Sequence, residues 1–148
     1  MNILQSGYSK EIRKVDEDAK ILIIEVMKGE KTGGFDVDSI YQFPDKTWVI
    51  VEFLKCISVR PFDSHPNRYW FKNSQKFISL WNLKCDLKGR LILVNYEDSR
   101  NQFLVINVEE INIEKGITKE EKLKMDFEEF KRFFVTLNRR ARGIDHEV

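Results

Sequence analysis

Four charged residues in the stretch GFDVDSIYQFPDKTWVIVEFLK (34–55) have the types and spacing to act on a phosphate ester: Asp36, Asp38, Glu52 and Lys55. Neighbouring carboxylates repel one another unless a cation lies between them. Mg²⁺ accepts one or two carboxylates and completes its coordination with water or phosphate oxygens. Such an ion activates a water and stabilises charge on the phosphate, and a nearby lysine would orient or deprotonate that water. The stretch therefore predicts a hydrolytic site that uses Mg²⁺ or Mn²⁺.

A β-hairpin would bring these acids together. Residues 35–43 alternate in polarity, residues 47–56 are almost continuously apolar, and Pro44-Asp45-Lys46 between them is a turn signal. If the turn is tight, Phe43 lies opposite Thr47, and Asp38 lies opposite Glu52. We therefore expect Asp38 and Glu52 to share a face, with Asp36 as the alternative to Asp38 if the register shifts.

The rest of the chain supplies elements around this hairpin. We expect a short helix over 8–18, a strand over 20–27 and a helix from Arg68 to Leu83 that carries an aromatic stripe. Strands over 90–97 and 102–111 follow, and Thr118 with Glu121 reads as a capping box that opens a final helix. The order α, β, β, β, α, β, β, α predicts one α/β domain over 1–148, with a mixed central sheet flanked by helices.

This arrangement resembles the PD-(D/E)xK, or restriction-endonuclease-like, nuclease superfamily. The resemblance covers about residues 8–97 and implies an αβββαβ core, to which residues 102–142 add a strand and a C-terminal helix. It implies metal binding by Asp38 and Glu52, with Asp36 as the alternative and Glu11 as a helper from the first helix. It also implies a positioning role for Gln75 on the helix that follows the third strand.

The lysine departs from the superfamily pattern, which has Glu-x-Lys where this chain has Glu-x-x-Lys. In a regular strand the side chain of Lys55 points away from the face that carries Glu52. A β-bulge near Phe53 or Leu54 would bring Lys55 back to that face. Otherwise Lys76, on the following helix, would supply the ammonium group. If neither lysine reaches the acids, the scaffold is inactive and binds nucleic acid or a protein partner.

A basic segment follows the apolar strand. Residues 53–90 hold eight Lys or Arg against two Asp in a chain whose net charge is only +1. Such asymmetry favours an anionic partner, and cations interleaved with aromatic side chains are typical of contacts with nucleic acid. We expect nucleic acid, with DNA as the leading candidate, to be held by Arg60, Arg68, Lys72 and Lys76. The alternative is a packed crossover loop with Trp70 in the core.

Composition limits the setting. The two cysteines, Cys56 and Cys85, form no paired motif, and together with His65 they do not match a zinc spacing. No apolar run is long enough to span a membrane, and the first residues lack the apolar block of a signal peptide. We expect a reduced, cytoplasmic protein, and small nucleases of this kind often pair to cut both strands, so a homodimer is expected.

Overall fold

A computed structural model describes residues 17–144, and the chain divides after Phe35 into two compact units. The described part of the first unit contains helix α1 (Asp18–Val26), in which no residue is buried. The strand expected over 20–27 is therefore wrong. A strand needs a neighbour to satisfy its backbone groups, whereas a helix satisfies them within the segment, so β-branched residues alone do not decide the outcome. Most of the helix expected over 8–18, including Glu11, lies outside the described residues.

The second unit, from Asp36 onward, is a five-stranded mixed sheet with the order β1-β2-β3-β4-β5. Strands β2 and β3 are parallel, and the other neighbouring pairs are antiparallel. The strands are β1 (Ser39–Gln42), β2 (Trp48–Lys55), β3 (Arg90–Tyr96), β4 (Phe103–Asn112) and β5 (Gly116–Met125). The predicted α/β class with a mixed sheet is thus confirmed.

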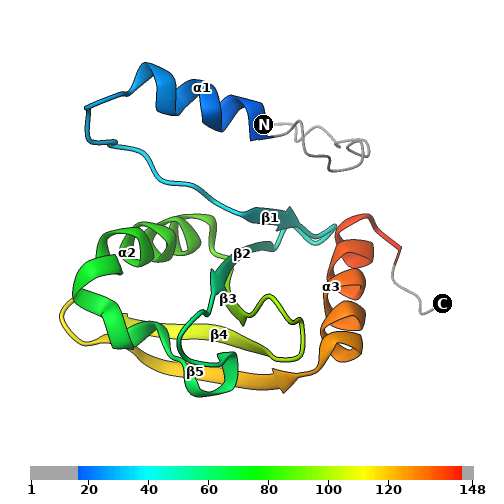
Figure 1. The fold of residues 1–148 in the computed structure, drawn as a ribbon. Helices are drawn as coiled ribbons and strands as arrows, with labels where there is room; N and C mark the ends of the chain where they lie inside the picture. Colours follow the sequence, from blue (N-terminus) through cyan, green and yellow to red (C-terminus); the bar gives the residue numbers. More distant parts are fainter. Residues whose placement is uncertain (1–16, 145–148) are drawn as a thin grey trace. The chain divides into compact units, whose positions relative to one another are not determined.

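The two long helices cover opposite faces of this sheet (Figure 1). Helix α2 (Trp70–Leu87) connects β2 to β3 and packs Phe77 and Leu80 against one face. Helix α3 (Phe127–Ala141) packs Phe130, Phe134 and Leu137 against the other face. Because β2 and β3 are covered on both faces, their sequences are continuously apolar, as is typical of central parallel strands.

The segment after Thr118 differs from the prediction. Residues 116–125 form the edge strand β5 rather than the first turns of a helix, and the capping box belongs to Asp126 and Glu129. The Asp126 side chain accepts from the Glu129 amide, and the Glu129 side chain accepts from the Asp126 amide. Pairing with β4 satisfies one side of the β5 backbone, which outweighs the local capping signal at Thr118 and Glu121.

Of the three strands predicted before the helix at 68–83, the structure forms only two, which pair as a hairpin. Before α2 the second unit contains only two strands, β1 and β2, joined by the turn at residues 44–46, and two short 3-10 helices follow at Pro61–Asp63 and Pro66–Tyr69. Strand β1 covers four of the nine residues expected, so Asp36 and Asp38 precede it rather than lie within it. None of the helices in the described part of the chain is long and apolar enough to cross a membrane.

Candidate functional site

The hairpin register places Asp38 beside Glu52. Ser39 pairs with Val51 and Ile40 with Ile50, so the next step of the ladder puts Asp38 opposite Glu52, as predicted. The Asp38 amide donates to Glu52 Oε2 at 3.4 Å, and the Phe53 amide donates to Asp38 Oδ2 at 2.8 Å. These two hydrogen bonds tie the residue before β1 to β2, and each carboxylate accepts from a backbone amide of the neighbouring segment.

Glu52 is a buried acid compensated by a lysine from α2. Its residue is 2% exposed, and Lys76 Nζ lies 2.5 Å from its Oε1. Burial raises the pKa of Glu52 above its usual 4.5, with the nearby Asp38 charge adding to the shift, while the Lys76 hydrogen bond opposes it. The carboxyl is therefore harder to ionise than an ordinary glutamate.

The same contact fixes the charge on Lys76. Burial opposes that charge, but the hydrogen bond and charge of Glu52 outweigh it, and the charges of Asp38 and Asp36 act in the same direction. The net effect raises the pKa of Lys76 above 10.5. Lys76 is therefore a fixed cation beside two acids at neutral pH rather than a proton acceptor.

Lys55 lies elsewhere. The pairing of β2 with β3 is regular through Lys55 and Tyr96, so the bulge that would bring Lys55 to the acids is not present. Its ammonium group forms an ion pair with Asp98 at 3.0 Å instead. The structure brings Lys76, not Lys55, to Glu52, because a regular strand alternates its side chains between the two faces.

The described residues offer a pair of acids rather than a larger set. Within residues 17–144 no three Asp, Glu, His or Cys side chains gather as a metal site. Asp36 is exposed and contributes charge near Lys76, and the proposed helper Glu11 lies outside the described residues. Two carboxylates still match what Mg²⁺ requires from a protein, since the ion retains several waters and uses substrate oxygens.

A cleft of about 480 Å³ opens beside Glu52 and Lys76. It lies at the carboxyl ends of β2 and β3, where α/β sheets commonly bind ligands. The crossover segment between β2 and α2 forms much of its wall. The polar side chains that line it, besides Glu52 and Lys76, are Lys55, Ser58, Ser64, His65, Arg68, Tyr69, Asn73 and Asn95, with the thiol of Cys56.

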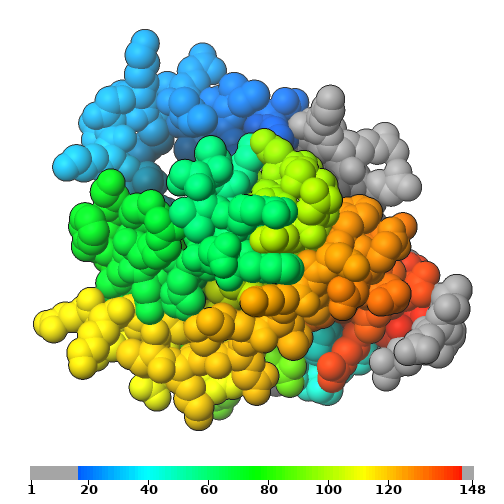
Figure 2. Space-filling model, turned by 60° about the horizontal axis from the view of Figure 1, so that its bottom comes forward, coloured from blue at the N-terminus to red at the C-terminus, as the bar shows by residue number. Residues whose placement is uncertain are grey.

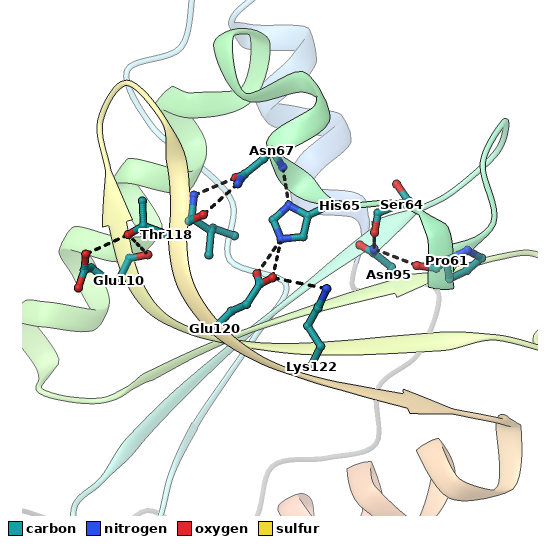
Figure 3. Close-up of polar contacts among 10 residues, drawn as sticks. Pro61, Ser64, His65, Asn67, Asn95, Glu110, Thr118, Glu120 and Lys122 are labelled. Carbon is teal, nitrogen blue, oxygen red and sulfur yellow. Dashed lines mark hydrogen bonds and ion pairs between the residues drawn. The ribbon is translucent and has the colours of Figure 1, made fainter.

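Hydrogen bonds fasten the crossover segment to the sheet (Figure 3). Asn95 is buried, and its side-chain amide donates to the carbonyl oxygens of Pro61 and Ser64 at 3.3 and 2.9 Å. His65 Nδ1 accepts from the Asn67 amide, so Nε2 carries the proton that meets the Glu120 carboxylate at 2.7 Å. The imidazole therefore joins the crossover segment to β5.

Asn67 completes this fastening. Its side chain accepts from the Ile117 amide at 2.8 Å and donates to the Ile117 carbonyl at 2.9 Å, as an added strand residue would. In the space-filling view the crossover segment, in green, lies directly against β5, in yellow to orange (Figure 2). The wall of the cleft is thus held by side chains from both neighbouring elements.

The expected substrate-binding residues divide into two groups. Arg60 is bound to Glu97 by two hydrogen bonds, at 3.2 and 2.8 Å, and these lower the pKa of Glu97 to about 2. Arg68 and Lys72 are exposed, and their charged groups lie 5.3 and 5.9 Å from the centre of the Tyr69 ring. Gln75 is exposed on α2 and does not line the cleft.

Asn95 and Asn73 line the cleft but were not predicted from the sequence. Asn95 had a detectable signal: it is the polar residue at the end of the apolar run RLILV, and a buried amide needs partners. Asn73 carried no such signal among the polar residues of α2. The thiols of Cys56 and Cys85 are both free, and Cys85 is exposed on α2.

Comparisons with protein families, curated proteins and solved structures found no match to this chain. Function is therefore inferred from the residues of the site.

Proposed function

We propose that this protein is a Mg²⁺-dependent nuclease that hydrolyses phosphodiester bonds of nucleic acid, with DNA as the expected substrate. The observation that carries the proposal is the contact of the buried Glu52 carboxylate with Lys76 from α2 and with the backbone amide of Asp38. Of these three residues, Glu52 and Lys76 line the cleft, and burying the Glu52 carboxylate costs free energy that a purely structural strand residue need not impose. A PD-(D/E)xK relationship remains part of this proposal.

Each side chain has a distinct task in the proposed reaction. Asp38 and Glu52 would hold the ion, which supplies an activated water and stabilises charge on the phosphate when it is bound. Lys76 stays protonated, so it would orient the water and stabilise negative charge on the phosphate rather than remove a proton. Arg68 and Lys72, whose charged groups both lie near the Tyr69 ring, would bind the phosphate backbone of the strand.

The test is cleavage of single-stranded and plasmid DNA with Mg²⁺ or Mn²⁺ and its loss in Glu52→Gln. Loss of a group behind a metal ligand costs about 10–100-fold, so loss of a ligand itself should cost more than about 100-fold. Glu109→Gln is the matched control, since Glu109 is also a strand glutamate paired with a lysine, Lys119. Equal cleavage by both variants would show that Glu52 has no role in the reaction.

A second candidate is a non-catalytic scaffold that binds nucleic acid or a protein partner. The ion pair between Lys76 and Glu52 favours it, because the lysine already neutralises the buried acid that a metal would otherwise neutralise. This candidate predicts DNA binding that is independent of Mg²⁺ and no cleavage by the wild-type protein. A homodimer belongs to the nuclease proposal, since two copies would cut two strands, and sedimentation with and without duplex DNA tests it.

A further inference from the structure

A second pocket, of about 530 Å³, lies on the α3 side of the sheet. Five of its seven lining residues are aromatic, and the other two are one acid and one arginine. The lining residues are Phe53, Tyr96, Phe103, Phe127 and Phe130, with Asp38 and Arg100. Neither the proposed metal site nor the cleft beside α2 accounts for this pocket.

The aromatic rings are arranged to receive another flat ring. Phe103 and Phe130 are stacked, with centroids 4.4 Å apart and planes within 1°, and Phe53 stands edge-on to Phe130 at 85°. Phe127 is 46% exposed although it is large and apolar. Proteins that hold single strands present aromatic faces of this kind, on which any base stacks.

Arg100 adds a positive charge to the aromatic lining of the pocket. The Arg100 guanidinium lies 5.8 Å from the centre of the Tyr96 ring. Its backbone is left-handed, with φ 62°, and its amide and side chain both donate to the Glu97 carbonyl. A purely apolar ligand would gain nothing from this charge, whereas a nucleotide combines a flat ring with a phosphate that arginine binds well.

Asp38 connects this pocket to the proposed reaction site. It lines the pocket, and its amide donates to the Glu52 carboxylate on the neighbouring strand. Phe53 lines both the pocket and the cleft and directly follows Glu52. A ring stacked in the pocket would therefore lie next to Asp38, while the Glu52 side chain lies with Lys76 on the α2 side of the sheet.

We propose that the aromatic pocket binds one unstacked base of a nucleic acid strand, beside Asp38 of the proposed metal site. The identity of the ligand rests on the proposed nuclease function. A base inside a paired duplex cannot enter such a pocket without leaving the stack. The preferred substrate is therefore a single strand, or a duplex with an unpaired nucleotide.

Binding in EDTA tests the pocket separately from cleavage. The probes are fluorescently labelled decathymidylate, an abasic ten-unit strand of the same charge and a paired ten-base-pair duplex, measured by anisotropy. We expect the wild-type protein to bind decathymidylate at least about 10-fold more tightly than the duplex or the abasic strand, because only the free bases can stack. Equal affinity for all three probes would overturn the proposal.

Variants of the pocket sharpen the result. Phe127→Leu keeps an apolar side chain and should weaken decathymidylate binding about 5–100-fold without changing the affinity for the abasic strand. Arg100→Gln should weaken both strands alike, because it removes a contact to phosphate. The control is Val135→Ala, since Val135 is 39% exposed on the same helix and does not line the pocket.

Two outcomes separate this inference from the nuclease proposal. If Phe127→Leu binds decathymidylate as well as the wild-type protein while DNA is still cleaved, the base-binding proposal is wrong and the nuclease proposal is retained. If Phe127→Leu shows the selective loss in EDTA while no cleavage occurs with Mg²⁺, the pocket stands as the base-binding part of a non-catalytic protein. Thermal unfolding of each variant confirms that it is folded.

Discussion

At the residue scale, the central feature of this protein is the buried carboxylate of Glu52. An ionised carboxylate in an apolar interior is costly unless a charge or hydrogen bonds compensate it. Here Lys76 and the Asp38 amide supply that compensation, and neither lies next to Glu52 in the sequence. The compensation brings together the groups that a phosphate-directed site needs, so stability and proposed function depend on the same contacts.

Removing the lysine tests this dependence. In Lys76→Met the pKa of Glu52 should rise further, because burial would no longer be opposed by a cation. At neutral pH we expect a loss of about 1–3 kcal/mol, below the range for a fully buried pair because Lys76 is 41% exposed. The loss should shrink toward zero below pH 4.5, where Glu52 is neutral in both the folded and the unfolded chain.

The sign of this pH effect follows from the direction of the shift. An acid whose pKa is raised by folding costs stability as the pH climbs through and above the pKa of the unfolded chain. Urea unfolding at pH 4 and pH 8 measures the difference between Lys76→Met and the wild-type protein. Lys84→Met, from the last turn of the same helix, should show the same effect at both values. An equal loss for Lys76→Met at pH 4 and pH 8 would contradict the assignment.

The pairing of Asp38 with Glu52 could be predicted from the sequence more readily than the lysine that contacts Glu52. The register that joins Asp38 to Glu52 follows from the position of one turn and the period of a strand. The choice of Lys76 over Lys55 depends on whether β2 contains a bulge and on how α2 is rotated about its axis. Both are set by packing against the sheet, which the spacing of two residues does not encode.

At the scale of helices and strands, the sequence predicted the element type correctly where the periodic pattern was strong, and wrongly where tertiary contacts overrode a local preference. The parallel pair β2 and β3 and helix α2 carried strong periodic signals and lie close to the expected bounds. Helix α1 and strand β5 were assigned the opposite structure, because each carried a local preference that tertiary context overrode. The aromatic pocket was not predicted, since its rings come from four separate elements, β2, β3, β4 and α3.

The turn between β4 and β5 is held against the crossover segment, and a glycine permits that contact. Gly116 has φ 94°, and a Cβ at this position would lie 2.3 Å from Asn67 Oδ1. We expect Gly116→Ala to destabilise the protein by about 2–3 kcal/mol, from the left-handed backbone and the displaced amide together. Denaturant unfolding measures the loss.

Gly33→Ala is the matched control for this substitution. Gly33 has no positive φ and no atom within 4 Å of the position its Cβ would take, so its replacement should change stability by less than about 0.5 kcal/mol. Because Asn67 also fixes one wall of the cleft, Gly116→Ala should weaken strand binding as well. Equal stability of the two variants would mean that the turn does not depend on Asn67.

At the scale of the whole molecule, the hydrophobic core of the described residues belongs to the second unit. Within residues 17–144, both hydrophobic clusters lie between Val37 and Ala141, one cluster under α2 and the other under α3. In α1 the large apolar side chains are exposed instead, including Ile21, Ile24 and Val26. The second unit therefore contains the sheet, both long helices, the acid pair and both pockets.

We therefore expect residues 36–148 to fold without the preceding 35. The truncated chain should retain the near-ultraviolet circular dichroism of the full chain, since Trp48, Trp70 and Trp81 all belong to the second unit. Its melting temperature should lie within about 4 °C of the full chain, which corresponds to about 1 kcal/mol for a domain of this size. A chain that lacks residues 126–148 is the contrasting control, because it loses Phe130, Phe134 and Leu137 from the core and should not fold. Loss of the near-ultraviolet signal on removing residues 1–35 would show that the sheet depends on the first unit.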